Sequence, residues 1–226
     1  MQIFLPNFEP FVTKVIFYRI PFNFGDSMSK HIGNSNVIKQ NEKEIKESLQ
    51  NKGPENTFRF ENTTPEYLRE FVLGSCVDDY LSFCVVRNPW DRFVSIYKSN
   101  RSDKKKQTFR SFCLDIEEKK HRDSLFFAKN QSDWCVNSPK HRVLRDESIS
   151  DDFLKMCNDI HLLGVDPKFI PLKKKKYKHY SSYYDSETKN IIAEVFKDDI
   201  DAFKYTFTEE DSDSQESRVS KGFLRI

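Results

Sequence analysis

Two short apolar runs constrain the fold of this chain more than any other feature of its sequence. Val15–Ile20 ends at Pro21, and Leu81–Val86 ends just before Asn88-Pro89. Neither run alternates between apolar and polar residues, which is typical of strands in a parallel sheet whose two faces are both covered. The sequence therefore predicts an α/β fold built on an open, mainly parallel sheet with flanking helices.

Helix signals lie next to these runs and farther along the chain. Thr64-Pro65 is a typical helix start, an N-cap residue followed by a first-turn proline, and Gly74 is the expected end of that helix. Asn88-Pro89 is a second start of the same kind. Residues 150–163 carry apolar side chains at helical spacing, and the stretch from Glu187 onward predicts the clearest amphipathic helix in the chain.

A single domain is expected to account for most of the 226 residues. Residues 1–13 are interpreted as an irregular N-terminal lead-in, and residues 14–207 as the domain. The polar tail, residues 208–226, is expected to be disordered. Within the domain, the charged residues 100–124 predict an irregular or helical insertion.

Charge and cysteine content exclude several classes of protein. The formal net charge of +2 is too small to indicate a nucleic-acid-binding surface. The five cysteines show no CxxC spacing, which favours reduced thiols in a reducing compartment. No apolar run approaches the ~20 residues of a membrane helix, and the N-terminus lacks the pattern of a signal peptide. We expect a soluble, cytoplasmic protein with no nucleic-acid partner and no membrane span in this chain, unless an anchor has been lost.

The Leu81–Val86 run leads directly into a helix start, which favours an anion site. In an open parallel sheet, ligands bind at the carboxyl ends of strands, where helix N-termini offer unpaired N–H groups. Arg87 stands at that point with a guanidinium suited to phosphate, and Ser95 offers a hydroxyl on the same helix. The alternative is that Arg87 pairs with a carboxylate such as Asp91.

The string around this turn, FCVVRNPWDRFVSIYK, resembles the 3′-phosphate-binding segment of carbohydrate-type sulfotransferases that use 3′-phosphoadenosine 5′-phosphosulfate (PAPS). The resemblance implies that Arg87 and Ser95 hold the 3′-phosphate of PAPS. It extends loosely over residues 14–207 and implies the sulfotransferase fold, a P-loop-like open sheet with flanking helices. The C-terminal stretch is similar to the same family's signature, with these residues in register: Tyr180, Tyr184, Asp199, Ile200, Phe203 and Tyr205.

The same resemblance assigns the turn after the first apolar run to the family's 5′-phosphosulfate loop, P-K-T-G/A-G-T-S. In such a loop the backbone N–H groups cradle the phosphate, and a glycine, here Gly25, permits close approach. Ser27 retains the hydroxyl of the pattern. The residues implied to contact the 5′ end of PAPS are Pro21, Phe22, Asn23, Phe24, Gly25, Asp26, Ser27 and Met28.

Three positions depart from the family's pattern where its chemistry takes place. Phe22 stands at the position of the loop lysine, which neutralises the charge on the bridging oxygen as the sulfuryl group leaves; losing such a group typically costs ~10²–10³ in rate. A lysine elsewhere, such as Lys30, is an alternative source of that charge. Asp26 places a carboxylate near the phosphate. Asn62 replaces the expected histidine base and leaves Glu61 as the candidate catalytic base, with a solvent-exposed or loop-capping carboxylate as the alternative.

Other chemistry-bearing residues receive simpler interpretations. FFAKNQSDW is similar to a family segment near the acceptor that often contains a histidine. Phe126 and Phe127 occupy that region here, and Gln131 and Trp134 are the other residues of the segment that remain from the pattern. Lys173–Lys176 is interpreted as a solvated basic turn, with attraction of nucleotide phosphates or an acidic glycan as the alternative. No metal is expected, because the histidines show no metal-ligand spacing and each is expected on the surface or in a loop: His31, His121, His141, His161 and His179.

Two hypotheses for the function follow. The first is a PAPS-dependent sulfotransferase that moves the sulfuryl group to a hydroxyl of an acceptor, implied to be a carbohydrate, and releases adenosine 3′,5′-bisphosphate. The second is a catalytically impaired sulfotransferase-like protein that binds nucleotide or glycan as an interaction module, motivated by Phe22, Asp26 and Asn62. A P-loop kinase is disfavoured because no GxxxxGK[ST] string is present. The identity of the acceptor and the oligomeric state cannot be deduced from this sequence.

Overall fold

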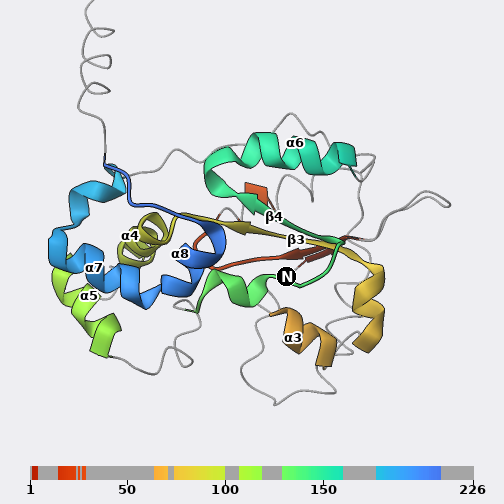
Figure 1. Cartoon of the computed structure of the whole chain (residues 1–226), viewed down its shortest axis with the longest axis horizontal. Coiled ribbons are helices and arrows are strands. Elements are labelled where there is room, and N and C mark those ends of the chain that lie inside the picture. The colour runs from red at the N-terminus through yellow and green to blue at the C-terminus, as the bar shows by residue number, and fades with distance from the viewer. Residues whose placement is uncertain are drawn as a thin grey trace, which may run out of the picture. The chain divides into compact units, whose positions relative to one another are not determined.

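The chain divides into two compact units. The sheet unit comprises Met1–Arg87 and Asp123–Lys173, and the helical unit comprises Asn88–Arg122 and Lys174–Ile226. Figure 1 shows the elements of each unit in the computed structural model. No helix among the residues that it describes is long and apolar enough to cross a bilayer. The described residues are 2–4, 15–23, 25, 27–28, 64–70, 74–99, 107–118, 129–159 and 177–209.

The sheet unit is built on one sheet with the strand order β1-β2-β3-β4 (Figure 1). The strands are β1 (Gln2–Phe4), β2 (Val15–Tyr18), β3 (Leu81–Val86) and β4 (His141–Arg145). β2, β3 and β4 are parallel, which confirms the predicted α/β class with its mainly parallel sheet. The interpretation of residues 1–13 as irregular is wrong at β1, which pairs antiparallel with β2. A strand of three residues is too short for its hydrophobic period to show in the sequence.

One face of this sheet is apolar and is covered by α6 (Ile149–Asp159), which lies against β4 (Figure 1). Alternate residues of β2 and β3 point to this face. Phe17 lies opposite Phe83 in the parallel register, and their rings stack with centroids 4.6 Å apart. The helix predicted over residues 150–163 corresponds to α6. The core cluster consists of Val15, Phe17, Met28, Leu81, Phe83, Val85, Leu144, Ile149, Phe153, Met156 and Cys157.

The other α-helix that the structure describes in the sheet unit is short. α3 (Pro65–Leu68) begins where predicted, since Thr64 Oγ1 accepts the Tyr67 N–H at 3.4 Å. Gly74, the expected helix end, opens the next 3₁₀ turn in the left-handed conformation, with φ 56°. The 3₁₀ turns are η3 (Gly74–Asp79), η7 (Gln131–Trp134) and η8 (Asp146–Ser148).

The helical unit is held together by an aromatic core. The ring of Phe93 lies 5.8, 5.1 and 6.2 Å from those of Phe109, Phe112 and Phe196. The predicted cap at Asn88 is confirmed, because its Oδ1 accepts the Trp90 N–H at 3.1 Å. The insertion predicted at residues 100–124 contains a helix, the second of its two alternatives. The elements of this unit are α4 (Pro89–Ser99), α5 (Phe109–Glu118), η9 (Tyr180–Tyr183), α7 (Ser186–Val195) and α8 (Lys197–Phe203).

The amphipathic helix predicted from Glu187 onward is divided into α7 and α8. The break falls at Phe196, whose backbone leaves the helical region with φ −114° and ψ 31°. No glycine or proline stands at this break, and the helical spacing of apolar residues continues across it, so the sequence predicts a single helix. Asp198 and Asp199 then occupy the first turn of α8, where acidic side chains stabilise a helix N-terminus.

Candidate functional site

The turn after β2 reverses the chain at Pro21 and Phe22. Phe22 takes a left-handed backbone conformation with φ 66°, which costs a non-glycine residue roughly 1–3 kcal/mol. Its carbonyl oxygen accepts a hydrogen bond from Arg87 Nη1 at 2.9 Å. The N–H of Asn23 donates to the carbonyl of Ile20 at 3.4 Å. Phe22, which stands at the position expected for a lysine, therefore contacts Arg87 through its backbone.

Asn23 and Gln131 connect this turn to the end of β3. Asn23 Nδ2 donates to the Val85 carbonyl at 2.6 Å and to Gln131 Oε1 at 2.8 Å. Gln131 is fully buried in η7. Its Oε1 accepts the Arg87 N–H at 2.9 Å, and its Nε2 donates to the Arg87 carbonyl at 2.9 Å. One side-chain amide thus satisfies both backbone groups of Arg87, as a neighbouring strand would.

The side chain of Arg87 is itself buried and paired with a carboxylate. Its Nε lies 3.3 Å from Asp146 Oδ2, and the two side chains are 7% and 12% exposed. The alternative of a carboxylate partner, considered from the sequence, is therefore realised with Asp146 in η8. The planar guanidinium fork carries five N–H donors. A phosphate that reached Arg87 would share or displace the Asp146 contact.

Gly25 packs closely against Arg19. A Cβ on Gly25 would stand 3.2 Å from Arg19 Nε, which is tighter than ordinary contacts and explains why glycine fits here. The guanidinium of Arg19 therefore lies beside the predicted phosphate loop. Ser27 and Met28 are buried, and Met28 belongs to the core cluster. No motif marks Arg19 in the sequence, because it lies inside the predicted Val15–Ile20 run and not between a strand end and a helix start, as Arg87 does.

The structure brings together part of the predicted site. The turn at Pro21–Asn23 and Arg87 are joined by the contacts through Phe22 and Gln131. Ser95 is partly buried on α4 of the helical unit. The sequence indicates Gln131 only through a segment that is similar to one of the family's, and it gives no signal for Asp146. The predicted residues that lie outside the described ones are Phe24, Asp26, Lys30, Glu61, Asn62, Phe126, Phe127 and Lys173–Lys176.

In the helical unit, the C-terminal residues pack against the Asn88-Pro89 segment. Tyr184 Oη donates to the Trp90 carbonyl at 2.9 Å, and Trp90 Nε1 donates to the Lys189 carbonyl at 3.1 Å. Asn88 Nδ2 donates to the Thr206 carbonyl at 3.0 Å. Burial raises the pKa of Tyr184, so its hydroxyl remains a donor. These contacts give both family-like segments of this unit a structural role.

Two histidines and four cysteine side chains are described. His179 caps η9, since its Nδ1 accepts the Ser181 N–H at 3.4 Å. The expectation of a surface or loop position is wrong for His141, which is partly buried on β4 with its Nε2 3.6 Å from Cys84 Sγ. The histidine spacing could not reveal this, because the pairing of β3 and β4 creates the contact. The cysteines Cys84, Cys113, Cys135 and Cys157 are thiols and not disulfides.

The family model that matches this chain is that of the Sulfotransferase family, over residues 11–206. Among solved structures, the chain is similar to a sulfotransferase from Alicyclobacillus acidocaldarius at 18% identity. That match covers 81% of this chain and 82% of the other, with a TM-score of 0.38. The curated proteins contain no match to this chain.

Proposed function

Because the chain belongs to the sulfotransferase family, we propose that it transfers the sulfuryl group of PAPS to a hydroxyl group of a carbohydrate acceptor. The observation that carries the proposal is the buried Arg87, whose backbone is held by Gln131 and whose guanidinium contacts the turn at Phe22. A preorganised cation beside a phosphate-type loop suits a donor with two phosphate groups, because charged groups already fixed in place need not reorganise during the reaction. PAPS acts as co-substrate and leaves as adenosine 3′,5′-bisphosphate.

In this proposal Arg87 and Ser95 hold the 3′-phosphate. An arginine fork binds phosphate with paired, charge-assisted hydrogen bonds, and a serine hydroxyl adds a neutral donor. The carboxylate of Asp146 keeps the guanidinium neutralised until the nucleotide arrives. Burial of the pair strengthens each charge interaction relative to water, which favours a doubly charged phosphate over a neutral ribose hydroxyl.

The loop from Pro21 to Met28 holds the 5′ end in the same proposal. During in-line transfer the acceptor oxygen bonds to sulfur while the bond from sulfur to the bridging oxygen breaks, and that electron pair stays on the 5′-phosphate. Phe22 has no charge with which to stabilise the negative charge that develops on the 5′-phosphate. We assign this role to Arg19, because its Nε lies 3.2 Å from the point where a Cβ on Gly25 would stand. Lys30 is the alternative.

Glu61 is the proposed base that takes the proton of the acceptor hydroxyl. The neighbouring Asn62 carries an amide, which has no basic site at neutral pH. Glu61→Gln is expected to abolish transfer while leaving nucleotide binding within about twofold of the unchanged protein, since the loss concerns a proton transfer.

We further infer that the reaction takes place in the cytoplasm, which the thiol state of the four described cysteines supports.

The experiment that tests the function compares two nucleotides and then measures transfer. Calorimetry is expected to show adenosine 3′,5′-bisphosphate binding at least about tenfold more tightly than ADP, because ADP lacks the 3′-phosphate. Arg87→Ala and Ser95→Ala are expected to remove that preference. Arg142→Ala is the matched control, since Arg142 donates only to the nearby Pro139 and His141 carbonyls in the contacts seen here.

Transfer is measured with labelled PAPS on a panel of glycans. Equal binding of the two nucleotides by the unchanged protein would contradict the donor assignment. Preferential binding without turnover on any acceptor would instead favour the impaired, nucleotide-binding module. Since Arg87→Ala leaves the Asp146 carboxylate buried, thermal unfolding of each variant is recorded first, and Ser95→Ala provides a test that leaves this pair intact.

A further inference from the structure

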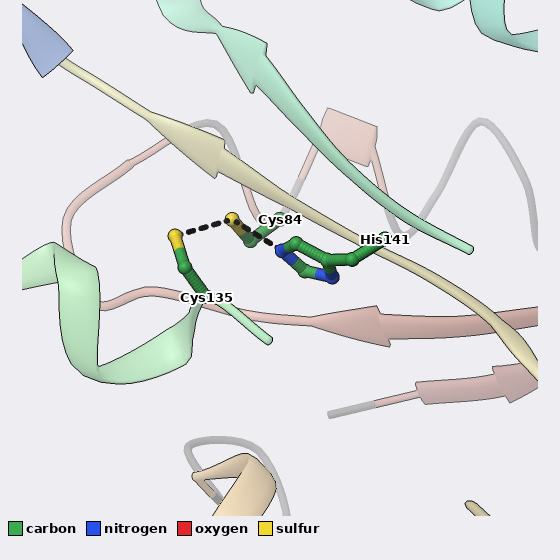
Figure 2. Close-up of side chains that lie close together, drawn as sticks. All are labelled: Cys84, Cys135 and His141. Carbon is green, nitrogen blue, oxygen red and sulfur yellow. Dashed lines mark hydrogen bonds between the residues drawn. The ribbon is translucent and has the colours of Figure 1, made fainter. Parts of the chain in front are cut away.

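Three metal-ligating side chains meet on the face of the sheet opposite α6 (Figure 2). Cys84 lies on β3, His141 on β4, and Cys135 follows η7. Cys84 is fully buried, while Cys135 and His141 are partly buried. Cys84 Sγ lies 3.6 Å from Cys135 Sγ and 3.6 Å from His141 Nε2, and all three ligand atoms lie within 4.8 Å of one another.

The two distances from Cys84 Sγ match edges of a tetrahedral metal site, and the third edge, between Cys135 and His141, is no longer than 4.8 Å. With zinc–sulfur bonds of about 2.3 Å and zinc–nitrogen bonds of about 2.0–2.1 Å, a tetrahedral angle places two sulfurs about 3.8 Å apart and a sulfur and a nitrogen about 3.6 Å apart. Both edges at Cys84 therefore have the required length. Two thiolates and an imidazole form a donor set for zinc, and they are a poor set for magnesium or calcium, which prefer oxygen ligands.

The imidazole of His141 is held in the orientation that ligation needs. Its Nδ1 lies 2.8 Å from Ser82 Oγ, one strand away, which leaves Nε2 directed at Cys84. Metal-bound histidines typically use the second ring nitrogen in such a hydrogen bond. Cys135 is positioned by the end of η7, where its backbone N–H donates to the Ser132 carbonyl at 2.9 Å.

A cavity of about 210 Å³ borders this cluster at Cys135, the one ligand of the three that lines it. Cys135, Ser82 and Tyr18 are among the residues that line it. The hydroxyl of Tyr18 is buried and has no hydrogen-bond partner among the described residues. A buried hydroxyl without a partner is costly, and a metal-bound water in this cavity would satisfy it.

We propose that Cys84, Cys135 and His141 bind one zinc ion, with a water from the cavity in the fourth position. The site joins β3, β4 and the end of η7. It thereby stabilises two elements that position Arg87, because β3 leads to this residue and Gln131 of η7 binds its backbone. The proposal does not depend on sulfuryl transfer, since its ligands and its test involve no nucleotide.

The test uses the purified, reduced full-length chain with zinc chloride and then cobalt chloride. We expect one equivalent of zinc to remain after dialysis, and the cobalt form to show thiolate-to-metal charge-transfer absorption. Cys135→Ser and His141→Gln are expected to weaken metal binding about 100-fold or more, because each removes a ligand. The matched control is Cys157→Ala, a buried thiol of the α6 face, which is expected to retain one equivalent.

A second measurement needs no variant. Zinc is expected to slow alkylation of Cys135 in the unchanged protein, as mapped by mass spectrometry. The proposal is overturned if the unchanged protein retains no metal, if both ligand variants bind as tightly as it does, or if Cys157→Ala loses the metal equally. It is also overturned if zinc leaves the alkylation of Cys135 unchanged, or if added zinc fails to prevent a Cys84–Cys135 disulfide under mild oxidation.

Discussion

The two arginines of the R-N-P-W-D-R string each pair with an aspartate, but in different surroundings. In the helical unit, Arg92 Nη1 lies 4.0 Å from Asp199 Oδ2, and the side chains are 1% and 0% exposed. The guanidinium of Arg92 also stands over the ring of Phe196, 5.8 Å from its centroid. In the sheet unit, Arg87 pairs with Asp146 at 3.3 Å, with exposures of 7% and 12%.

This difference distinguishes a fully enclosed pair from the pair that lies at the site proposed for a phosphate. Arg92 and Asp199 are enclosed by the aromatic core of the helical unit, so removing either one leaves the other buried without this counter-charge. Arg87 is slightly more exposed and contacts the turn at Phe22, and it is the arginine to which the proposed function assigns a phosphate, at the expense of Asp146. Two arginines of one sequence string thus lie in different surroundings, one inside the helical unit and one at the candidate site.

The largest expected effect is the loss of the enclosed pair. Arg92→Met is expected to lower the free energy of unfolding by about 3–5 kcal/mol, because the carboxylate of Asp199 stays buried without its cation. Urea unfolding followed by circular dichroism measures this change. The double variant Arg92→Met/Asp199→Leu is the control. It is expected to recover most of the loss, since an apolar pair carries no desolvation penalty. A loss below about 1 kcal/mol for the single variant would show that this pair is not structural.

A smaller effect is expected from a change in the pair of Arg87 and Asp146. Asp146→Asn is expected to tighten the binding of adenosine 3′,5′-bisphosphate about tenfold, or about 1.4 kcal/mol, because the carboxylate no longer competes for Arg87. Calorimetry at fixed ionic strength measures the dissociation constant. Asp151→Asn is the control, because Asp151 is an exposed aspartate in the first turn of the adjacent α6. Weaker binding by the Asp146 variant would mean that this carboxylate orients Arg87 for the nucleotide.

Much of the fold could be predicted, because two strands carry strong local signals. β3 matches the predicted Leu81–Val86, in which every residue except Ser82 is apolar, as burial on both faces requires. β4 was not predicted, since its sequence HRVLR contains a single buried residue, Leu144, and only its pairing with β3 makes it a strand. The division of α7 from α8 escaped prediction for a similar reason, because nothing in the residues at Phe196 breaks a helix.

Only part of the candidate site could be predicted from the sequence, for a similar reason. Arg87 and the turn at Pro21 follow directly from strand ends and from a recognisable string. Two of the side chains that complete their surroundings come from distant segments, Gln131 from η7 and Asp146 from η8, and only tertiary structure brings them to the site. Arg19 is a local neighbour that directly follows β2.

The smallest effect is expected from a third arginine–aspartate pair, on the surface of the helical unit. Arg110 Nη1 lies 3.3 Å from Asp185 Oδ2, with both side chains 54% exposed. Asp185 also caps α7, and its pKa is lowered mainly by the hydrogen bonds from Thr188, with Arg110 as a minor cause. A lowered carboxyl pKa stabilises the fold above the unfolded value of 3.8, and the stabilisation is lost as the pH falls through the folded pKa.

Arg110→Met is therefore expected to leave the thermal unfolding midpoint unchanged within error at pH 7 and to keep most of the lowered pKa of Asp185. Thr188→Val, which removes the hydroxyl that donates to Asp185 Oδ1 at 2.8 Å, is expected to raise this pKa more than Arg110→Met does. Titration of the Asp185 carboxyl by NMR measures both shifts. A larger pKa shift in the Arg110 variant would show that the charge of Arg110, and not the hydrogen bonds of the helix cap, is the main cause of the lowered pKa of Asp185. The exposed fraction of the side chains would then not predict the relative importance of the three arginine–aspartate pairs.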